Sequence, residues 1–172
     1  MTAAKTRTQH SAPLYTPEER KRRDETRWTV VQGALAPLQF LVFLISLVLV
    51  VNYLVNGSGL EAATASIVVK TGVLLTIMVT GAIWEKVVFG QYLFAPAFFW
   101  EDVVSFGVIA LHILYVGCWL VGFGTPEQQM WIALAAYATY VVNAAQFLLK
   151  LQAARRDESG TPSSIAMQGA IE

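Results

Sequence analysis

The chain alternates between four long apolar blocks and short polar breaks. The blocks run from Trp28 to Asn56, from Glu61 to about Phe89, from about Phe98 to Phe123 and from about Glu127 to Leu151. Each is at least as long as the roughly 20 residues that a helix needs to cross a hydrocarbon core about 30 Å thick. The breaks NGSG and GTPE, and a connector over 90–97 that contains Pro96, are typical of turns. The pattern therefore predicts an all-α integral membrane protein, a four-helix bundle.

Composition supports the membrane class and divides the chain into three parts. Of the 172 residues, 55% are hydrophobic and only 14% are charged, which is too apolar for an ordinary soluble domain of this size. We expect a flexible basic N-terminal arm over 1–27, a transmembrane domain over 28–151 and a short polar tail over 152–172. The formal net charge of zero gives no electrostatic footprint for nucleic acid, so no nucleic-acid partner is expected.

The distribution of basic residues predicts the orientation of the bundle. Lysine and arginine crowd the arm and follow the last apolar block, whereas the breaks NGSGLE and GTPEQQ contain neither. Cytoplasmic loops carry the excess of positive charge in membrane proteins. An even number of spans returns the chain to the side on which it began, so both termini are predicted to be cytoplasmic.

Ionisable residues inside the blocks are the candidates for chemistry. Glu85 ends the second block and Glu101 and Asp102 begin the third, so all three carboxylates are expected near the cytoplasmic leaflet. Lys70 and His112 lie deeper, each about 15 Å along its helix from an interface at about 1.5 Å per residue, where they could meet. Neighbouring positions on a helix point about 100° apart, so Glu101 and Asp102 are not expected to face the same place.

Each of these residues also has an ordinary structural explanation. The carboxylates and Lys86 could pair with one another or extend into the headgroups. His112 could make an interhelical hydrogen bond, and the amides Gln32, Gln39, Asn143 and Gln146 more often hold helices together than form sites. The sequence lacks the GxGxxG, P-loop, HExxH, CxxC and GxSxG motifs, which removes support for the common nucleotide, zinc and serine-hydrolase chemistries.

Three stretches of the chain resemble one family. They are LYTPEER at 14–20, QGALAPLQFLVF at 32–43 and, above all, IWEKVVFGQYLFAPAFFWEDVVS at 83–105. The likeness extends from about Leu14 into the third block, and it is to the 3-vinyl bacteriochlorophyllide hydratases of anoxygenic phototrophic bacteria. The resemblance implies a hydro-lyase of bacteriochlorophyll biosynthesis in the bacterial inner, photosynthetic membrane, with membrane lipid, other pathway enzymes or a second copy of the chain as further partners. Such an enzyme would add water to the vinyl group of a chlorophyllide-type tetrapyrrole and give a 1-hydroxyethyl group.

This reaction assigns expected roles to the candidate residues. Hydration of a conjugated vinyl group needs a proton donor and a base for water, and Glu85, Glu101 and Asp102 supply the carboxyl groups. No cofactor is expected, because the magnesium is carried by the substrate. His112 is a possible axial ligand to that magnesium, and Lys86 or the basic arm could receive the substrate carboxylate. The remaining candidates for contact with the ring are Lys70, Trp84 and Trp100.

Two other functions fit parts of the pattern. A non-catalytic pigment-binding or assembly factor would need an apolar groove but not the carboxylates. A small proton-coupled transporter would use Lys70 and the membrane acids, but polar groups should then continue through the periplasmic half. Asn52, Asn56 and Glu61 are sparse there and close to the surface, which argues against a path through the membrane.

Overall fold

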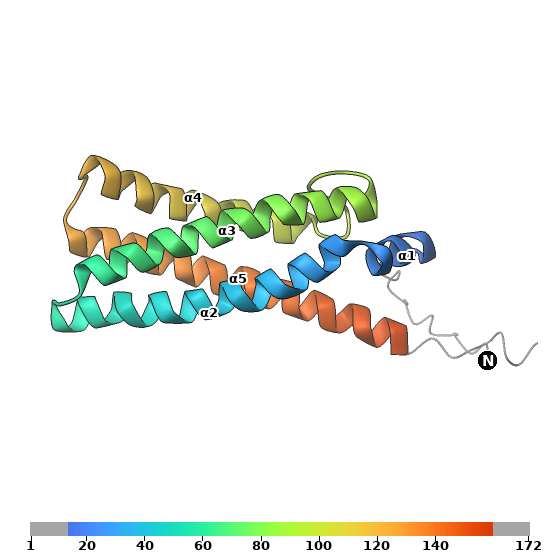
Figure 1. Ribbon diagram of the computed structural model, residues 1–172, viewed down its shortest axis with the longest axis horizontal. Coiled ribbons are helices and arrows are strands. Elements are labelled where there is room, and N and C mark those ends of the chain that lie inside the picture. Colours follow the sequence, from blue (N-terminus) through green and yellow to red (C-terminus); the bar gives the residue numbers. More distant parts are fainter. Residues whose placement is uncertain (1–13, 160–172) are drawn as a thin grey trace, which may run out of the picture.

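Five helices make up the regular structure of the described part of the chain, residues 14–159 of a computed structural model. They are α1 (Pro17–Glu25), α2 (Arg27–Asn56), α3 (Leu60–Phe89), α4 (Phe99–Val121) and α5 (Pro126–Ser159). The last four run alternately up and down as an elongated bundle, and α1 lies across one end of it (Figure 1). Each of these four is long and apolar enough to cross a membrane. The expected all-α architecture with four apolar spans is confirmed.

The bundle consists of two helical hairpins. α2 packs chiefly against α3, and α4 packs chiefly against α5. The hairpins meet through α2 against α5 and α3 against α4. A tight turn closes the first hairpin, where Gly57 ends α2 with a φ of 68° that few other residues adopt without strain.

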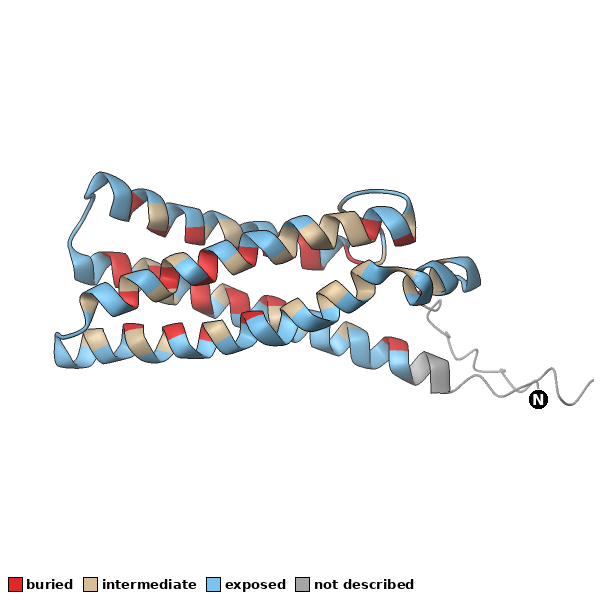
Figure 2. Cartoon of the chain, viewed as in Figure 1, coloured by how far each residue is buried: buried red, intermediate tan, exposed pale blue. Residues whose placement is uncertain are grey.

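Burial follows the inner faces of the helices. Red residues form stripes that face the interior, and most of the outer surface is exposed (Figure 2). Much of that outer surface is apolar, including Val30, Val48, Leu120 and Leu149, as the contact of a spanning helix with lipid requires. The interior is packed around Phe43, Ile67, Tyr115 and Tyr137, among others.

The N-terminal segment differs from the flexible arm that we expected over 1–27, although residues 1–13 lie outside the described part. Over 14–27 the chain forms α1, none of whose residues is buried, and the start of α2. Thr16 and Glu19 form a capping box at the start of α1, each side chain bonding the other's backbone N–H. Tyr15 is buried and stacks on Phe89 at 5.8 Å between ring centroids. The cap and the ring contact order this segment.

The last helix continues beyond the expected boundary at Leu151. α5 reaches Ser159, so the first part of the expected polar tail, 152–159, is helical; residues 160–172 lie outside the described part. Its sequence, QAARRDES, begins with good helix formers. Ala154 is 4% exposed and joins a small cluster with Tyr15, Val88 and Phe98, which gives this turn a packing partner.

Candidate active site

The three candidate carboxylates meet at one end of the bundle, hereafter the carboxylate end. Glu85 lies in the last turns of α3, and Glu101 and Asp102 lie in the first turn of α4. All three are between 3% and 7% exposed. The carboxyl groups of Glu85 and Asp102 lie within hydrogen-bonding reach of each other. Two acids from different helices therefore form a buried pair.

The connector between α3 and α4 holds this pair in place. The backbone N–H of Phe94 donates to Asp102 Oδ2 at 2.6 Å, and that of Ala95 donates to Glu85 Oε2 at 3.3 Å. Phe94 is the one non-glycine residue with positive φ among residues 14–159, at 58°. A side chain in this region costs about 1–2 kcal/mol. The ring of Phe94 stacks on Phe106 at 5.5 Å, which helps to offset that cost.

Glu101 faces a different helix from Asp102. Its Oε2 accepts a hydrogen bond from Lys150 Nζ of α5 at 2.7 Å, as an ion pair in which both side chains are largely buried. The ammonium of Lys150 also lies 5.1 Å from the ring centroid of Phe98. Adjacent residues on α4 thus serve separate neighbours, as the helical angle between them predicts. Lys150 was not identified from the sequence, because its partner is 49 residues away.

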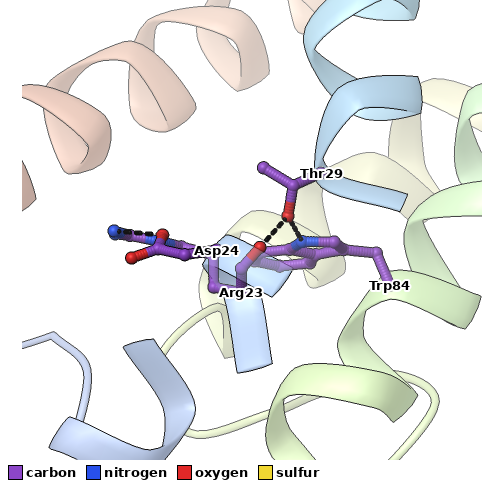
Figure 3. Close-up of polar contacts among 4 residues, drawn as sticks. All are labelled: Arg23, Asp24, Thr29 and Trp84. Atoms are coloured by element: carbon purple, nitrogen blue, oxygen red, sulfur yellow. Dashed lines mark hydrogen bonds and ion pairs between the residues drawn. The ribbon is translucent and has the colours of Figure 1, made fainter. Parts of the chain in front are cut away.

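A hydrogen-bond chain ties α1 and α2 to the carboxylate end (Figure 3). Trp84, next to Glu85, donates from Nε1 to Thr29 Oγ1 at 2.9 Å. The Thr29 hydroxyl donates to the backbone carbonyl of Arg23 at 2.6 Å, and the Arg23 guanidinium pairs with Asp24 at 2.8 Å. Trp84 also packs edge-on against Phe98. The ring of Trp84 therefore has a structural role beside the acids.

Lys70 and His112 do meet in the interior, as the depth argument predicted. Lys70 Nζ lies 3.0 Å from His112 Nε2, and His112 Nδ1 lies 2.7 Å from the Val108 carbonyl oxygen. Both residues are completely buried. The Lys70 ammonium also lies 4.2 Å from the ring centroid of Tyr140. Because both nitrogens of His112 have partners, binding of magnesium at Nε2 would require the Lys70 contact to break.

The remaining predicted residues lie at the surface. Lys86 is exposed and donates from Nζ to the Gly90 carbonyl oxygen at 2.7 Å, which caps the end of α3. Trp100 is 68% exposed, and its ring meets Phe99 edge-on. The structure thus brings Glu85, Glu101 and Asp102 together and leaves Trp100 on the outer surface.

Polar residues that the sequence analysis weighed lightly line the interior between α2, α4 and α5. Asn143 donates from Nδ2 to Ser105 Oγ at 2.8 Å. Gln39 is only 2% exposed, and within the described part of the chain neither of its amide atoms has a hydrogen-bond partner. An unmet buried polar group costs about 1–3 kcal/mol. The signal in the sequence is an amide within an apolar block, which alone cannot distinguish helix packing from a site.

No group of three or more His, Cys, Asp or Glu side chains in the described chain is arranged to hold a metal ion. The carboxylate end instead offers acids, an ammonium group and backbone amides. This set can donate a proton, accept one and orient water.

Comparison with known proteins identifies the family. The model of the family described as 2-vinyl bacteriochlorophyllide hydratase matches residues 15–153. The chain belongs to this family. A 2-vinyl bacteriochlorophyllide hydratase of Cereibacter sphaeroides is 72% identical over 145 residues, which cover 84% of this chain and 89% of that protein. One of Rhodobacter capsulatus is 71% identical over 143 residues, 83% of this chain and 82% of that protein. No solved structure matches the chain.

The match confirms the resemblance seen in the sequence. The family name numbers the vinyl position 2 rather than 3, and both names describe hydration of a ring vinyl group. The matched range 15–153 includes Glu85, Glu101, Asp102 and Lys150, together with Tyr15 at its first position. Members of the family are hydratases, so the chain is an enzyme of the hydro-lyase class.

Proposed function

We propose that this protein adds one molecule of water across the ring vinyl group of a bacteriochlorophyllide and so forms a 1-hydroxyethyl group. The observation that carries the proposal is the family match over residues 15–153, which spans the whole carboxylate end. The buried carboxylates support it, because they supply the acid and base that a hydration needs.

The reaction proceeds in two steps. The vinyl π electrons take a proton at the terminal carbon, which becomes a methyl group, and the inner carbon is left as a cation that the conjugated ring delocalises. A lone pair of water then forms the C–O bond at the inner carbon, and the water loses one proton to a base. The proton consumed in the first step equals the proton released in the second, so no oxidant or reductant is used and no redox cofactor is needed. The magnesium belongs to the substrate.

The acid in this proposal is the Glu85–Asp102 pair. Two carboxyl groups in contact at a buried site repel each other when both are ionised, so such a pair holds one proton between them. The backbone amides of Phe94 and Ala95 bind one oxygen of each group and leave the others free to share that proton. The pair can therefore present a proton to the substrate.

The base is Glu101. Its carboxylate turns toward α5, away from the acid pair, and Lys150 fixes its orientation through the 2.7 Å ion pair. Acid and base on adjacent residues of one helix can act on the two carbons of a vinyl group from different sides. Each role contributes typically a factor of about 10² to 10⁴ in rate.

The substrate enters from the lipid. A large flat ring partitions into the bilayer, whereas its carboxylate seeks the interface. Lys86 is exposed at the end of α3, and the basic residues of α1 lie at the same end of the bundle (Figure 1). These cations are suited to bind the carboxylate. In this proposal the carboxylate end faces the cytoplasm, because the basic residues gather there.

A second role is proposed for His112, that of axial ligand to the substrate magnesium. A neutral imidazole is a common metal ligand, but here Nε2 is engaged by Lys70. The role therefore requires that the ring displace the Lys70 ammonium. If the His112→Phe variant binds the pigment with unchanged affinity, His112 is not a ligand to the magnesium.

The decisive experiment supplies the vinyl substrate to membranes of a host that makes no bacteriochlorophyll. Membranes that contain the protein should yield a product heavier by one water, as detected by mass spectrometry. Membranes with the double variant Glu85→Gln, Asp102→Asn, expressed to the same level, serve as the matched control and should yield none. If the wild-type protein binds the pigment but adds no water while it remains folded, the pigment-binding function replaces this proposal.

A further inference from the structure

Three side-chain amides gather in the interior next to the carboxylate end. They are Gln39 of α2 and Asn143 and Gln146 of α5, called here the buried amide group. Gln39 is 2% exposed and Asn143 is 7% exposed. Among residues 14–159, no partner binds Gln39 Oε1, Gln39 Nε2, Asn143 Oδ1 or Gln146 Oε1. The group offers three free acceptors and one free donor nitrogen inside an apolar bundle.

Gln39 and Asn143 lie near one level of α2 and α5, which run antiparallel and are in contact, and Gln146 is about one turn further along α5 (Figure 1). The rings of Phe43 and Tyr140 meet at 4.9 Å between centroids. Gln39 is one turn from Phe43 toward the carboxylate end, and Asn143 is nearly one turn from Tyr140 in the same direction. The two residues therefore occupy the next layer of the same interface.

This layer adjoins the proposed base. Asn143 donates to Ser105 Oγ at 2.8 Å, and Ser105 is four residues, about 6 Å along α4, from Glu101. Gln146 is four residues from Lys150, the ion-pair partner of Glu101. The amides thus continue inward from Glu101 along both α4 and α5.

The pattern of free atoms indicates which ligand fits. The ligand must donate hydrogen bonds to oxygen atoms and also accept one from Gln39 Nε2. A carbonyl group of a pigment can only accept, whereas a water molecule does both. Backbone and side-chain polar groups within a bilayer need such partners, since lipid supplies none. We propose that the buried amide group binds the water molecule that attacks the substrate, so that it is the site of the second substrate.

This inference rests on the proposed hydration and adds a step to it. Gln39 Nε2 donates to the water oxygen, an amide oxygen accepts from one of its hydrogens and the Glu101 carboxylate accepts from the other, which leaves one lone pair for the C–O bond. The proton that the water loses passes to Glu101. Gln39 thus contributes to the capture of the cation but not to its formation.

Running the reaction in D2O separates the formation of the cation from its capture by water. An acid that carries deuterium delivers it to the terminal vinyl carbon. A cation that water does not capture loses a proton from its new methyl group and returns to the vinyl substrate with deuterium in it. The ratio of deuterium in recovered substrate to hydrated product therefore measures failed capture. Because it is a ratio, it does not depend on how much protein is folded.

Gln39→Met is the variant and Gln32→Met is the matched control. Gln32 lies on the same helix but donates to Thr80 Oγ1 at 2.8 Å, outside the buried amide group. We expect the ratio to rise about tenfold or more in Gln39→Met, the scale of one transition-state interaction, and to stay at the wild-type value in Gln32→Met. If Gln39→Met does not accumulate, Gln39→Asn keeps an amide but shortens it, and the same rise is expected.

The outcomes separate this inference from the proposed function. Wild-type membranes that give neither product nor exchange would overturn both. A wild-type protein that hydrates the substrate, with an unchanged ratio in the Gln39 variants, would overturn the water site alone. An unchanged ratio together with a raised KM would also overturn it, because the amides would then bind the pigment. A raised ratio with little change in KM supports the water site.

Discussion

Buried carboxylates in this protein differ in the groups that surround them. Glu85 and Asp102 face each other and two backbone amides, whereas Glu101 faces an ammonium group. Identical chemistry in different surroundings is what allows one acid to give a proton and another to take it. The roles can therefore be tested one residue at a time.

Replacing each acid by its amide keeps its shape but removes its proton chemistry. We expect Glu85→Gln, Asp102→Asn and Glu101→Gln each to lower kcat by about 10² to 10⁴ while the pigment still binds. Initial rates and pigment affinity in membranes measure both effects. Glu61→Gln, an exposed change at the opposite end of α3, is the control and should leave the rate unchanged. Full activity in all three variants would contradict the acid–base assignment.

The Lys70–His112 contact gives a prediction about stability. His112→Phe leaves the buried Lys70 amino group without its nitrogen partner, which costs about 1–3 kcal/mol. Lys70→Met removes the charge itself and should cost less, and the double variant should be more stable than His112→Phe. Thermal unfolding in detergent of the wild type, the two single variants and the double variant gives a double-mutant cycle, from which the coupling free energy between Lys70 and His112 is obtained. Additive effects of the two changes would show that the contact contributes nothing.

At the residue scale, the sequence predicts the face of a helix on which a residue lies but not the residues that it contacts on other helices. The helical spacing correctly placed Glu101 and Asp102 on different sides of α4 and allowed Lys70 to meet His112. It could not predict that Lys150 would pair with Glu101, because that contact depends on how α4 and α5 are aligned in space. The isolation of Gln39 could not be predicted for the same reason, since it appears only when its neighbours are known.

At the scale of elements, seven of the eight ends of the four apolar helices were predicted to within two residues, because the bilayer sets their length and composition. The bounds of the short helix α1 were not predicted, although Thr16 and Glu19 have the spacing of a capping box. A charged nine-residue helix gives no hydrophobic period, so pattern analysis cannot detect it. α5 continues eight residues past Leu151, because polar residues continue a helix as readily as they end it.

The attachment of α1 depends on Tyr15. Its ring stacks on Phe89, and the Arg23 guanidinium lies 4.8 Å from its centroid. We expect Tyr15→Ala to release α1 from the bundle and to cost about 3 kcal/mol, the range for loss of a large buried ring. Faster cleavage by trypsin after Arg20 to Arg23 would report the release. Tyr92→Ala, which removes a ring that is 60% exposed, is the control. Equal cleavage of both variants would show that Tyr15 does not anchor α1.

At the scale of the whole molecule, orientation is the property that the bundle itself leaves open. The two ends differ in charge: the basic residues of α1 gather at the carboxylate end, and the turn between α2 and α3 has none. The positive-inside rule places the end that carries the basic residues in the cytoplasm. The prediction is that α1 lies in the cytoplasm and the turn at Ser58 lies outside it.

Single cysteines can test the direction. Cys118 is buried, and in a Cys118→Ala background Ser58→Cys and Lys21→Cys each introduce one exposed thiol. An impermeant maleimide should label Ser58→Cys in intact spheroplasts, but Lys21→Cys only after the membrane is broken. The reverse pattern would invert the bundle and move the acids to the periplasmic side.

The division of the bundle into two hairpins has a consequence for how the protein is made. Lys70 belongs to the first hairpin, as does Phe43, whose ring centroid lies 5.8 Å from its ammonium, whereas its nearer neighbours His112, Tyr137 and Tyr140 belong to the second. A nascent chain that has inserted only α2 and α3 therefore carries a cation deep in lipid, at a cost of about 2.5–3.5 kcal/mol on insertion scales. Synthesis of the second hairpin removes that cost. We therefore expect the first hairpin alone to insert less completely than the full chain does, which protease protection of a chain that ends at Phe89 would measure.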